Sequence, residues 1–359
     1  MVASVRFRFL TSTPLDIRRG SGTYVGIQLL ARGLESLGHT VAFETPQRHF
    51  PIYTLERLWF NRTVRPSTEF DCSVGFDMDG YRAADIASLK GVIADEARFE
   101  RGFTWGTMSL QARCEKLHVE RARRVLATSR YSAERAREFY RLSSLPEVVP
   151  ELIDLNEWRR LLAEVEKPQA KPPAPPTSKF SALFVGRFYR RKRIDVLLRA
   201  AAILRSRIPG LEVRLVGNGP RGPALRAIAR RLKLDQSVVW LGDVSRADLA
   251  REYNRASVFC LPSVQEGFGI VLLEAMAAGK PIVASRAAAI PETAPHAALV
   301  EADQPEALAQ GIEYLYASSA ARAMQREAGM QWVERFDAPR VARLFLNAVA
   351  GRTATYTSA

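Results

Sequence analysis

The stretch Gln265-Glu266-Gly267-Phe268-Gly269-Ile270-Val271-Leu272-Leu273-Glu274-Ala275-Met276-Ala277-Ala278-Gly279-Lys280-Pro281 decides the fold of its half of the chain. An apolar run at 257–262 precedes it and a second apolar run, 282–284, follows it; both are typical of buried strands. Between them the pattern predicts a glycine-bearing loop and then an amphipathic helix that ends at Gly279. Strand, loop, helix and strand form a βαβ unit, so we expect a parallel α/β sheet.

Two carboxylates in this stretch are candidates for ligand binding. Glu266 lies in the loop beside the predicted helix start, and a helix start attracts phosphate. Glu274 lies among apolar residues, where a charged side chain more often binds something than stays idle. A carboxylate accepts hydrogen bonds from sugar hydroxyls. The ordinary alternatives are that Glu266 stabilises the helix dipole and that Glu274 is simply exposed.

The same pattern of strand, glycine and helix recurs upstream, with apolar runs at 182–185, 211–216 and 238–241. Glycines follow these runs at Gly186, Gly217 and Gly242, at the carboxyl ends of strands, where open α/β sheets bind ligands. Arg187 and Lys192 occupy the first of these loops and suit a pyrophosphate, the arginine as a fork and the lysine as a point charge. A solvated basic loop remains the alternative.

Strand and helix patterns also alternate through the first half of the chain. This half is therefore predicted to form a second α/β domain with a parallel sheet. We expect strands at 5–10, 40–43, 72–75, 91–94 and 125–128, and helices at 81–89, 108–122 and 133–140. A loop with Gly20 and Gly22 follows the first strand, either to bind phosphate or sugar or only to make a tight turn. The triplet Asp77-Met78-Asp79 is interpreted as a loop that lines the ligand cleft, rather than as a divalent metal site.

The composition shifts at 167–177, which is rich in proline and has no apolar periodicity. We therefore predict an N-terminal Rossmann-like domain at 1–155, a linker at 156–180, a C-terminal Rossmann-like domain at 181–335 and a terminal helical segment at 336–359.

Composition narrows the class of protein. The chain has 359 residues and 47% apolar content, as in a soluble globular protein of two domains, and it lacks a run of about 18 apolar residues. Its start reads as a strand rather than a signal peptide.

Cys72, Cys114 and Cys260 are expected to be buried free thiols in a reducing cytoplasm. The net charge of +14 favours anionic substrates or lipid headgroups, since no nucleic-acid-binding signature accompanies it.

From about residue 181 to 315 the chain resembles the retaining glycosyltransferases of family 4, which have the GT-B fold. The resemblance rests on motifs in the right order, namely Val185-Gly186-Arg187 with Lys192, Val216-Gly217-Asn218-Gly219-Pro220, Leu261-Pro262-Ser263, and Glu266-Gly267-Phe268-Gly269 through to Pro281. The first half is similar more loosely, through Gly20-Ser21-Gly22, Ala127-Thr128-Ser129 and Val149-Pro150-Glu151.

The resemblance implies two Rossmann-like domains that face a cleft, with a nucleotide sugar held between them. Arg187 and Lys192 would bind the diphosphate and Glu274 the ribose, with Gly217 and Gly242 lining the nucleotide site. Glu266 would hold the donor sugar together with the N–H groups of Phe268, Gly269 and Ile270. Gly20, Gly22 and Ser129 would contribute from the first domain, and the helix after Pro339 would pack back onto that domain.

Two departures from the family pattern concern the first half. Family members usually have a sugar-contacting histidine after the strand near residue 94, where this chain reads Ala94-Asp95-Glu96. That role therefore passes to Asp95 or is lost. The family's Pro-Asn-Gly-Val-Asp is Pro150-Glu151-Leu152-Ile153-Asp154 here, which suggests a subgroup with altered detail.

The resulting hypothesis is a cytoplasmic enzyme that transfers sugar from a UDP-, GDP- or ADP-sugar to a glycan, lipid-linked or small-molecule acceptor. It expects no cofactor, no bound metal and no nucleic-acid partner. A sugar-nucleotide epimerase of the same fold, or a degenerate member that only binds a nucleotide sugar, are the alternatives. Peripheral contact with an anionic membrane is also expected, with Arg18, Arg19, Arg57, Arg62 and Arg65 as candidates for the lipid-facing charges.

Overall fold

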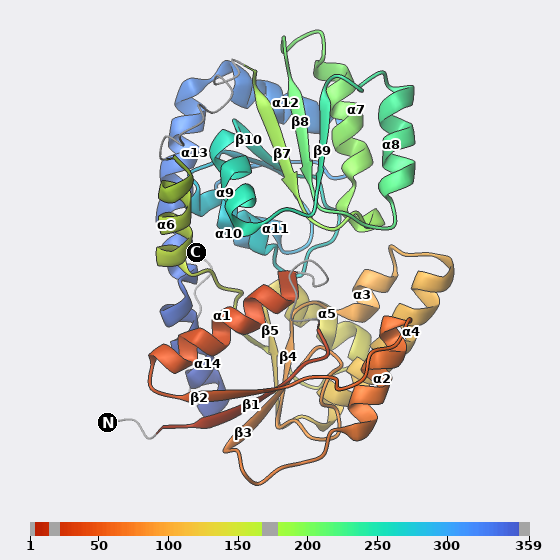
Figure 1. Cartoon of the computed structure of the whole chain (residues 1–359), viewed down its shortest axis with the longest axis vertical. Helices are drawn as coiled ribbons and strands as arrows, with labels where there is room; N and C mark the ends of the chain where they lie inside the picture. The colour runs from red at the N-terminus through yellow and green to blue at the C-terminus, as the bar shows by residue number, and fades with distance from the viewer. Residues whose placement is uncertain (1–3, 14–21, 167–178, 352–359) are drawn as a thin grey trace. The chain divides into compact units, whose positions relative to one another are not determined.

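The computed structural model describes residues 4–13, 22–166 and 179–351 (Figure 1). The chain divides into two units, the first made of residues 1–152 with 336–359 and the second of residues 153–335. Each unit contains one six-stranded sheet among the described residues, and neighbouring strands in both sheets pair in parallel. Both are therefore α/β units built on a parallel sheet, as the alternating pattern predicts.

The first unit has the strand order β2-β1-β3-β4-β5-β6. Its strands are β1 (Arg6–Leu10), β2 (Thr40–Glu44), β3 (Cys72–Phe76), β4 (Ile86–Leu89), β5 (Arg124–Ala127) and β6 (Glu147–Val148). Its helices are α1 (Gly22–Ser36), α2 (Tyr53–Thr63), α3 (Ile93–Ala97), α4 (Gly102–Arg121), α5 (Arg130–Tyr140) and α14 (Ala338–Ala350).

Helix α14 completes the main core of the first unit. Phe345 contacts Phe7 and Phe9 of β1, with ring centroids 6.0 and 6.4 Å apart. Helices α1 and α14 pack closely, because at Gly33 an added Cβ would lie only 3.0 Å from the Cβ of Ala342. The last helix of the chain is thus a structural part of the first unit.

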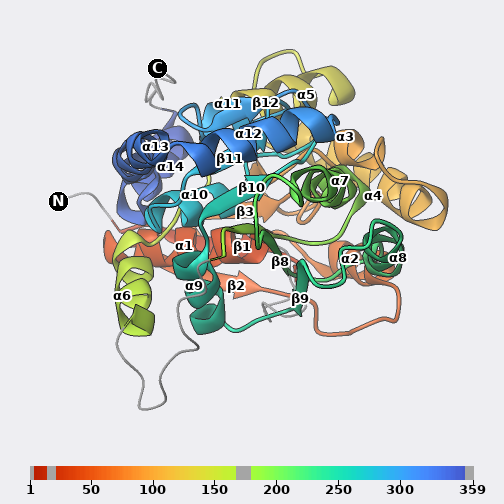
Figure 2. The same cartoon turned by 90° about the horizontal axis from the view of Figure 1, so that it is seen from above.

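The second unit has the strand order β12-β11-β10-β7-β8-β9. Its strands are β7 (Ser181–Val185), β8 (Glu212–Val216), β9 (Val238–Gly242), β10 (Val258–Leu261), β11 (Ile282–Ser285) and β12 (Ala298–Val300). Its helices are α6 (Leu155–Glu166), α7 (Ile194–Leu204), α8 (Gly222–Arg231), α9 (Arg246–Arg255), α10 (Ile270–Ala277), α11 (Ile290–Thr293), α12 (Pro305–Ala317) and α13 (Ser319–Trp332). Helices α7 and α12 cover one face of the sheet, and α9 and α10 the other (Figure 2).

Two predictions of local structure are wrong. The helix expected at 81–89 ends in strand β4, because the buried run at 86–89 pairs with β3 and β5 on either side. The strand expected at 91–94 is instead the start of α3. Short apolar runs do not distinguish strand from helix, and here the neighbouring strands decide.

The predicted linker at 156–180 is wrong in its first part. Residues 155–166 form α6, whose Leu155, Trp158 and Leu162 are buried, and the helix packs on α9 and α10. The spacing of these three residues is that of an amphipathic helix, so the buried face explains the structure. The proline-rich segment at 167–177 lies outside the described residues.

The three cysteines are free thiols and are buried, as expected. Burial raises the pKa of each, so none has thiolate character at neutral pH. None of the helices that the structure describes combines the length and apolar character required to cross a bilayer.

Candidate functional site: the loops after β7 and β10

The candidate site of the second unit lies where the strand order of its sheet reverses. In the sheet, β7 lies between β8, which is the next strand in the chain, and β10, which comes later in the chain. The loops that leave β7 and β10 therefore open beside each other at the carboxyl edge of the sheet, the usual ligand position in open α/β sheets. Arg187 and Lys192 follow β7, and Glu266 follows β10.

Lys192 and Glu266 form an ion pair that joins these two loops. The Nζ atom of Lys192 donates to Oε1 of Glu266 at 2.6 Å, and both side chains are largely buried. A backbone hydrogen bond from the N–H of Val264 to the carbonyl of Arg191 ties the same loops together. Burial by itself raises the pKa of Glu266, but the charges of Lys192 and Arg191 outweigh it and hold that pKa below its usual value. Glu266 is therefore an anion at neutral pH.

Arg187 differs from Lys192 because it is not neutralised by a neighbouring acid. Its half-buried side chain makes no hydrogen bond or ion pair with any residue that the structure describes. An unpaired, partly desolvated guanidinium is costly unless an anion completes it. Arg187 is thus available for an anionic ligand.

The N-terminus of α10 adds further donors to the same edge. Gly269 precedes the helix with a φ of 94°, a left-handed conformation that favours glycine. The N–H groups of Ile270 and Val271 open the helix and have no intrahelical acceptor, whereas the N–H of Leu272 donates to the carbonyl of Gly269 at 2.8 Å. Phe268 is buried, and its carbonyl accepts a hydrogen bond from Thr293 at 2.8 Å, which fixes the loop that leads into the helix.

Glu274 lies on α10, half-buried, and is held by an aromatic hydroxyl. The hydroxyl of Tyr253 donates to Oε2 of Glu274 at 3.0 Å, and the indole N–H of Trp158 donates to the backbone carbonyl of Glu274 at 3.1 Å. Burial raises the pKa of Glu274 to about 6, against the opposing effects of Tyr253 and Arg246. A carboxylate in this setting gains stability when a ligand supplies hydroxyl donors.

Gly217 and Gly242 lie together at the ends of β8 and β9. The N–H of Gly217 donates to the carbonyl of Gly242 at 2.7 Å, and the φ angles of these residues are 114° and 68°. A Cβ at Gly217 would lie 2.2 Å from the carbonyl oxygen of Gly186, so only glycine fits there. A cavity of about 660 Å³ lies beside them, lined in part by Asn218, Gly219, Arg226 and Trp240.

The predicted site residues of the first unit do not form a comparable cluster in the described part of the chain. Gly20 lies outside the described residues, and Gly22 is the first residue of α1. The Ser129 hydroxyl accepts a hydrogen bond from the N–H of Ser132 and caps α5. Asp95 is fully buried on α3, where Tyr131 donates to it at 2.6 Å and Arg98 at 3.2 Å. Its sugar-contacting role remains a prediction.

Residues 165–332 match the family model described as glycosyl transferases group 1. This range spans nearly all of the second unit and contains every candidate residue described for it. Residues 165–332 form a group 1 glycosyl transferase domain.

Relatives of this transferase domain include two proteins named D-inositol 3-phosphate glycosyltransferase. The one from Kribbella flavida is 44% identical over 111 residues, which cover 28% of this chain and 26% of the relative. The one from Pseudarthrobacter chlorophenolicus is 36% identical over 150 residues, covering 40% of this chain and 36% of the relative. The matched part thus spans well under half of the length of these relatives.

Solved structures are similar over nearly the whole chain. Sucrose-phosphate synthase from Thermosynechococcus elongatus has a TM-score of 0.76 at 20% identity and covers 97% of this chain and 100% of its own. Anabaena HepE, solved in complex with UDP-glucose, has a TM-score of 0.71 at 18% identity with the same coverages. These likenesses show the fold: both units belong to the GT-B architecture.

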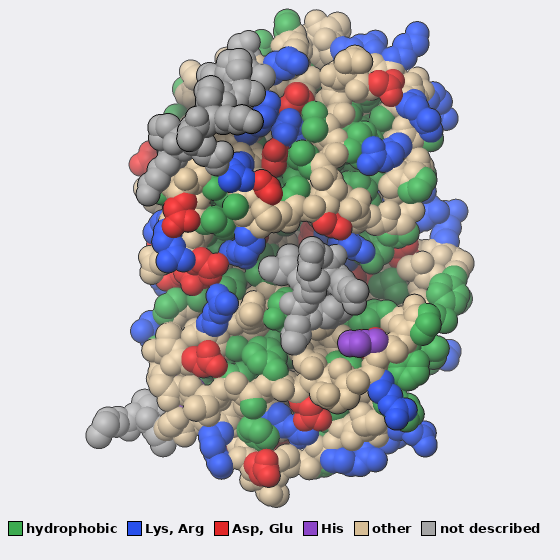
Figure 3. Space-filling view, viewed as in Figure 1, with side chains coloured by type: hydrophobic (Ala, Val, Ile, Leu, Met, Phe, Trp, Pro, Cys, Tyr) green, Lys and Arg blue, Asp and Glu red, His purple; other side chains and the backbone are tan. Residues whose placement is uncertain are grey.

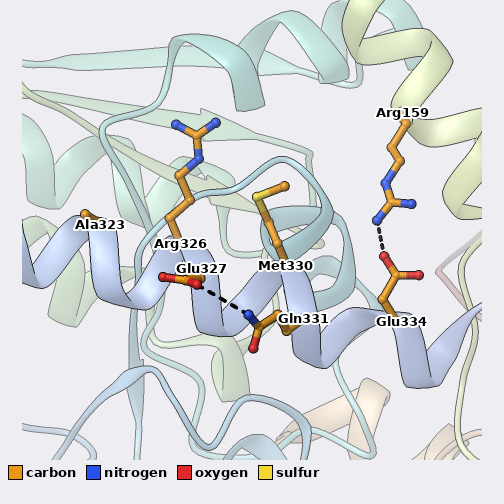
Figure 4. A pocket seen from close by; sticks show the side chains of 7 residues that line it. All are labelled: Arg159, Ala323, Arg326, Glu327, Met330, Gln331 and Glu334. Atoms are coloured by element: carbon orange, nitrogen blue, oxygen red, sulfur yellow. Dashed lines mark hydrogen bonds and ion pairs between the residues drawn. The ribbon is translucent and has the colours of Figure 1, made fainter.

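A second pocket of the second unit, of about 440 Å³, contains none of the predicted site residues. Figure 4 shows that it is lined by side chains of α13, by Glu334 just after that helix, and by Arg159 of α6, which pairs with Glu334. It lies along two helices rather than at the carboxyl edge of the sheet, so it is not part of the candidate site.

Sequence reasoning missed two features of the N-terminal unit. Lys90 follows β4 and forms a buried ion pair with Glu151 at 3.0 Å. Asp79, after β3, accepts hydrogen bonds from the N–H and the hydroxyl of Ser12, both at 2.7 Å, and pairs with the buried Arg57 at 3.3 Å. The Asp-X-Asp triplet was the visible signal, but the arginine that pairs with it comes from a distant helix and has no local signature.

Proposed function

We propose that the chain is a retaining glycosyltransferase that moves a sugar from a nucleotide-diphosphate donor to an acceptor hydroxyl. The observation that carries the proposal is the Lys192–Glu266 ion pair at the strand-order reversal, beside the unpaired Arg187 and the start of α10. The match to group 1 glycosyl transferases and the likeness to HepE, which was solved in complex with UDP-glucose, support it.

Each group has a role set by its charge. Arg187 and Lys192 bind the diphosphate, and the first N–H groups of α10 donate to the same anionic end of the donor. Glu266 accepts hydrogen bonds from hydroxyls of the transferred sugar, and Glu274 from the ribose. The base lies beside Gly217 and Gly242, next to the cavity that Trp240 and Arg226 line.

The reaction is a substitution at the anomeric carbon of the donor sugar. The bond from this carbon to the diphosphate oxygen breaks, and negative charge grows on the diphosphate, where Arg187, Lys192 and the helix N–H groups stabilise it. The acceptor hydroxyl attacks from the face that the diphosphate leaves, and a phosphate oxygen takes its proton. Because the hydroxyl enters on the face that the diphosphate leaves, configuration is retained, and no protein nucleophile takes part.

The test compares three single variants in a sugar-transfer assay with the donor that binds. Arg187→Ala and Lys192→Ala should each lower kcat by more than about 100-fold, if each group supplies about 3 kcal/mol at the transition state. Arg190→Ala is the matched control, because Arg190 is an exposed arginine of the same loop. Activity near wild type in both site variants would reject the assignment.

The donor is identified by a thermal-shift screen of uridine, guanosine and adenosine diphosphates and their sugars, in which the right ligand raises the melting temperature. Incubation with that donor alone separates transfer from epimerisation, since an epimerase would convert the donor without an acceptor. A degenerate binding protein would show the thermal shift but no turnover.

Metal independence and membrane contact belong to the same proposal. The described residues contain no cluster of three His, Cys, Asp or Glu side chains able to hold a metal ion. Activity that survives EDTA would support metal-independent transfer.

The acceptor is a glycan, a lipid-linked sugar or a small molecule. The net charge of +14 supports peripheral contact with anionic lipid. The five arginines predicted from the sequence are not enough to locate the surface that makes this contact.

A further inference from the structure

The arginines that the sequence suggested for lipid contact do not all lie on the surface. Arg57 is buried in its pair with Asp79, and Arg18 and Arg19 lie outside the described residues. Of the three that the structure describes, Arg62 and Arg65 are exposed. A membrane-facing surface must therefore be sought from the structure.

Helices α2 and α4 of the first unit bury polar side chains beside apolar ones such as Phe60 and Val119, and they leave other large apolar side chains exposed to solvent. On α2 the buried residues include Glu56, Arg57 and Asn61, whereas Leu55 is 47% exposed. A surface helix normally turns its apolar stripe to the core and its charges to water.

Helix α4 shows the same combination of buried polar and exposed apolar side chains over a greater length. Its buried residues include Gln111, Glu115 and His118, while Phe103, Leu110 and Leu117 are exposed. These three apolar residues recur every seven positions, so they form one stripe along the outer side of the helix. Trp105 beside them is 55% exposed and Phe103 is 71% exposed.

Polar contacts between the two helices fix this orientation. Nη1 of Arg57 donates to Oε1 of Gln111 at 2.9 Å, and Nε2 of Gln111 donates to the hydroxyl of Thr54 at 2.7 Å. Rolling either helix to hide its exposed apolar side chains would break these bonds and the buried Arg57–Asp79 pair. The apolar side chains are therefore held outward.

We define the α2–α4 face as the exposed side chains of these helices and of the residue before α2: Ile52, Tyr53, Leu55, Trp59, Phe103, Trp105, Leu110 and Leu117. Hydrophobic side chains gather at the edge of the molecule where α4 lies (Figures 1 and 3). Such a contiguous exposed group marks an interaction surface.

The charges around the α2–α4 face select its partner. Arg48, Arg62, Arg101 and Arg113 are exposed on or beside it and form no ion pair with any described residue. Arg48 instead lies over the ring of Trp59, 5.4 Å from its centroid. The exposed Glu120 of α4 is already paired with Lys116. Aromatic side chains with unpaired arginines suit an interface between acyl chains and anionic headgroups.

We infer that the α2–α4 face docks on an anionic lipid bilayer, with its aromatic side chains in the headgroup region and its arginines against lipid phosphates. This inference deepens the membrane contact of the proposed function and does not depend on sugar transfer.

The test measures co-sedimentation of the full chain with vesicles of phosphatidylcholine, with and without phosphatidylglycerol. The wild type should bind the anionic vesicles and lose binding at high salt. The triple variant Phe103→Ser, Trp105→Ser and Leu110→Ser should bind at least tenfold more weakly. Tyr314→Ser with Met324→Ser, exposed apolar residues of the second unit, is the matched control and should bind as the wild type does.

The charge arm uses Arg101→Gln with Arg113→Gln, which should weaken binding about fivefold for each arginine. Arg205→Gln with Arg231→Gln, exposed arginines of the second unit, is its control. A blue shift of tryptophan fluorescence on vesicle addition that is lost in Trp105→Leu would place α4 at the lipid.

Three results would overturn the inference: no vesicle binding at low salt, equal binding by the triple variant, or a wild-type dimer that the triple variant abolishes. The last would make the face a contact between two copies of the chain. Nucleotide thermal shifts on the triple variant and on Arg101→Gln with Arg113→Gln report on folding and on the proposed function separately, because these five residues lie outside residues 165–332.

Discussion

The carboxylate of Glu274 links pH to both ligand binding and stability. Burial raises its pKa to about 6, so the folded, ligand-free protein binds this proton more readily than the unfolded chain does. Stability from this group is therefore present below the unfolded pKa and is lost as pH rises through about 6. A ribose that donates to the carboxylate has the opposite preference, because it binds the ionised form.

We therefore predict that nucleotide affinity falls as pH is lowered from 7.5 to 5.5, and that this dependence disappears in Glu274→Gln. The same variant should be about 1 kcal/mol more stable than the wild type at pH 8, a value discounted for the partial exposure of the side chain. Titration calorimetry and urea denaturation at several pH values measure the two effects. A pH-independent affinity in the wild type would contradict the ribose assignment.

Under the proposed function, Tyr253 is a positioning residue that acts on the donor through Glu274. Its hydroxyl donates to Oε2 of Glu274 at 3.0 Å and stabilises the ionised carboxylate. Tyr253→Phe should thus weaken nucleotide binding about threefold to tenfold and move the pH midpoint for binding upward. Removal of packing alone would lower stability but leave that midpoint in place, so the pH profile separates the two explanations.

Lys90 and Glu151 form a buried ion pair in the first unit. Its main contribution to stability should be that each residue neutralises the charge of the other inside the protein. Burial raises the pKa of Glu151, and Lys90 opposes this shift. Lys90→Met leaves a buried carboxylate without its partner and should cost about 3 to 5 kcal/mol at pH 8. The loss should shrink towards pH 5, because Glu151 can then take up a proton. Lys90→Met with Glu151→Met, which removes both charges, should be more stable than the single variant.

At the residue scale, the sequence identified candidate binding residues, but it did not identify the residues with which they form bonds. Lys192 and Glu266 were both candidates, but the direct bond between them joins loops 74 positions apart and has no local signal. Asp95 was chosen from a strand pattern at 91–94, yet that segment is a helix in which the carboxylate is buried. Long-range contacts decide both cases.

At the scale of elements, α6 shows that helix propensity was present in the sequence but was masked by the prolines after it. Trp158 is fully buried and its ring meets Tyr253 edge-on at 5.7 Å. Asn254 of α9 donates to the carbonyl of Leu162 at 3.0 Å. The spacing of the buried residues was readable, whereas the surface that α6 covers was not. The repeated order of strand, glycine and helix was readable because it is local.

Helix α6 should therefore support the donor site as well as the fold. Trp158→Ala should cost about 3 to 5 kcal/mol and also weaken nucleotide binding, since Trp158 contacts both Tyr253 and Glu274. Leu162→Ala, one turn further along α6, is the control: it should lower stability while leaving the affinity of the folded protein unchanged. Equal affinity in both variants would show that α6 has no part in ligand binding.

At the scale of the whole molecule, the chain consists of two units whose cores draw on different segments. The core of the first unit needs α14, because Phe345 is buried against Phe7 and Phe9. The second unit has its own core, in which Ile312 of α12 is buried. Separate cores permit separate unfolding, as in other two-domain proteins.

We predict two transitions in differential scanning calorimetry, each of which one substitution lowers selectively. Phe345→Ala should lower only the transition of the first unit and Ile312→Ala only that of the second, by about 3 to 5 kcal/mol and about 2 to 5 kcal/mol in unfolding free energy. A bound nucleoside diphosphate should raise the transition that Ile312→Ala lowers, because Arg187, Lys192 and Glu274 all belong to that unit. Phe345→Ala lowers the stability of the first unit, but the nucleotide should still raise the transition temperature of the second unit in this variant. A single transition, lowered equally by both variants, would show instead that the two units unfold as one.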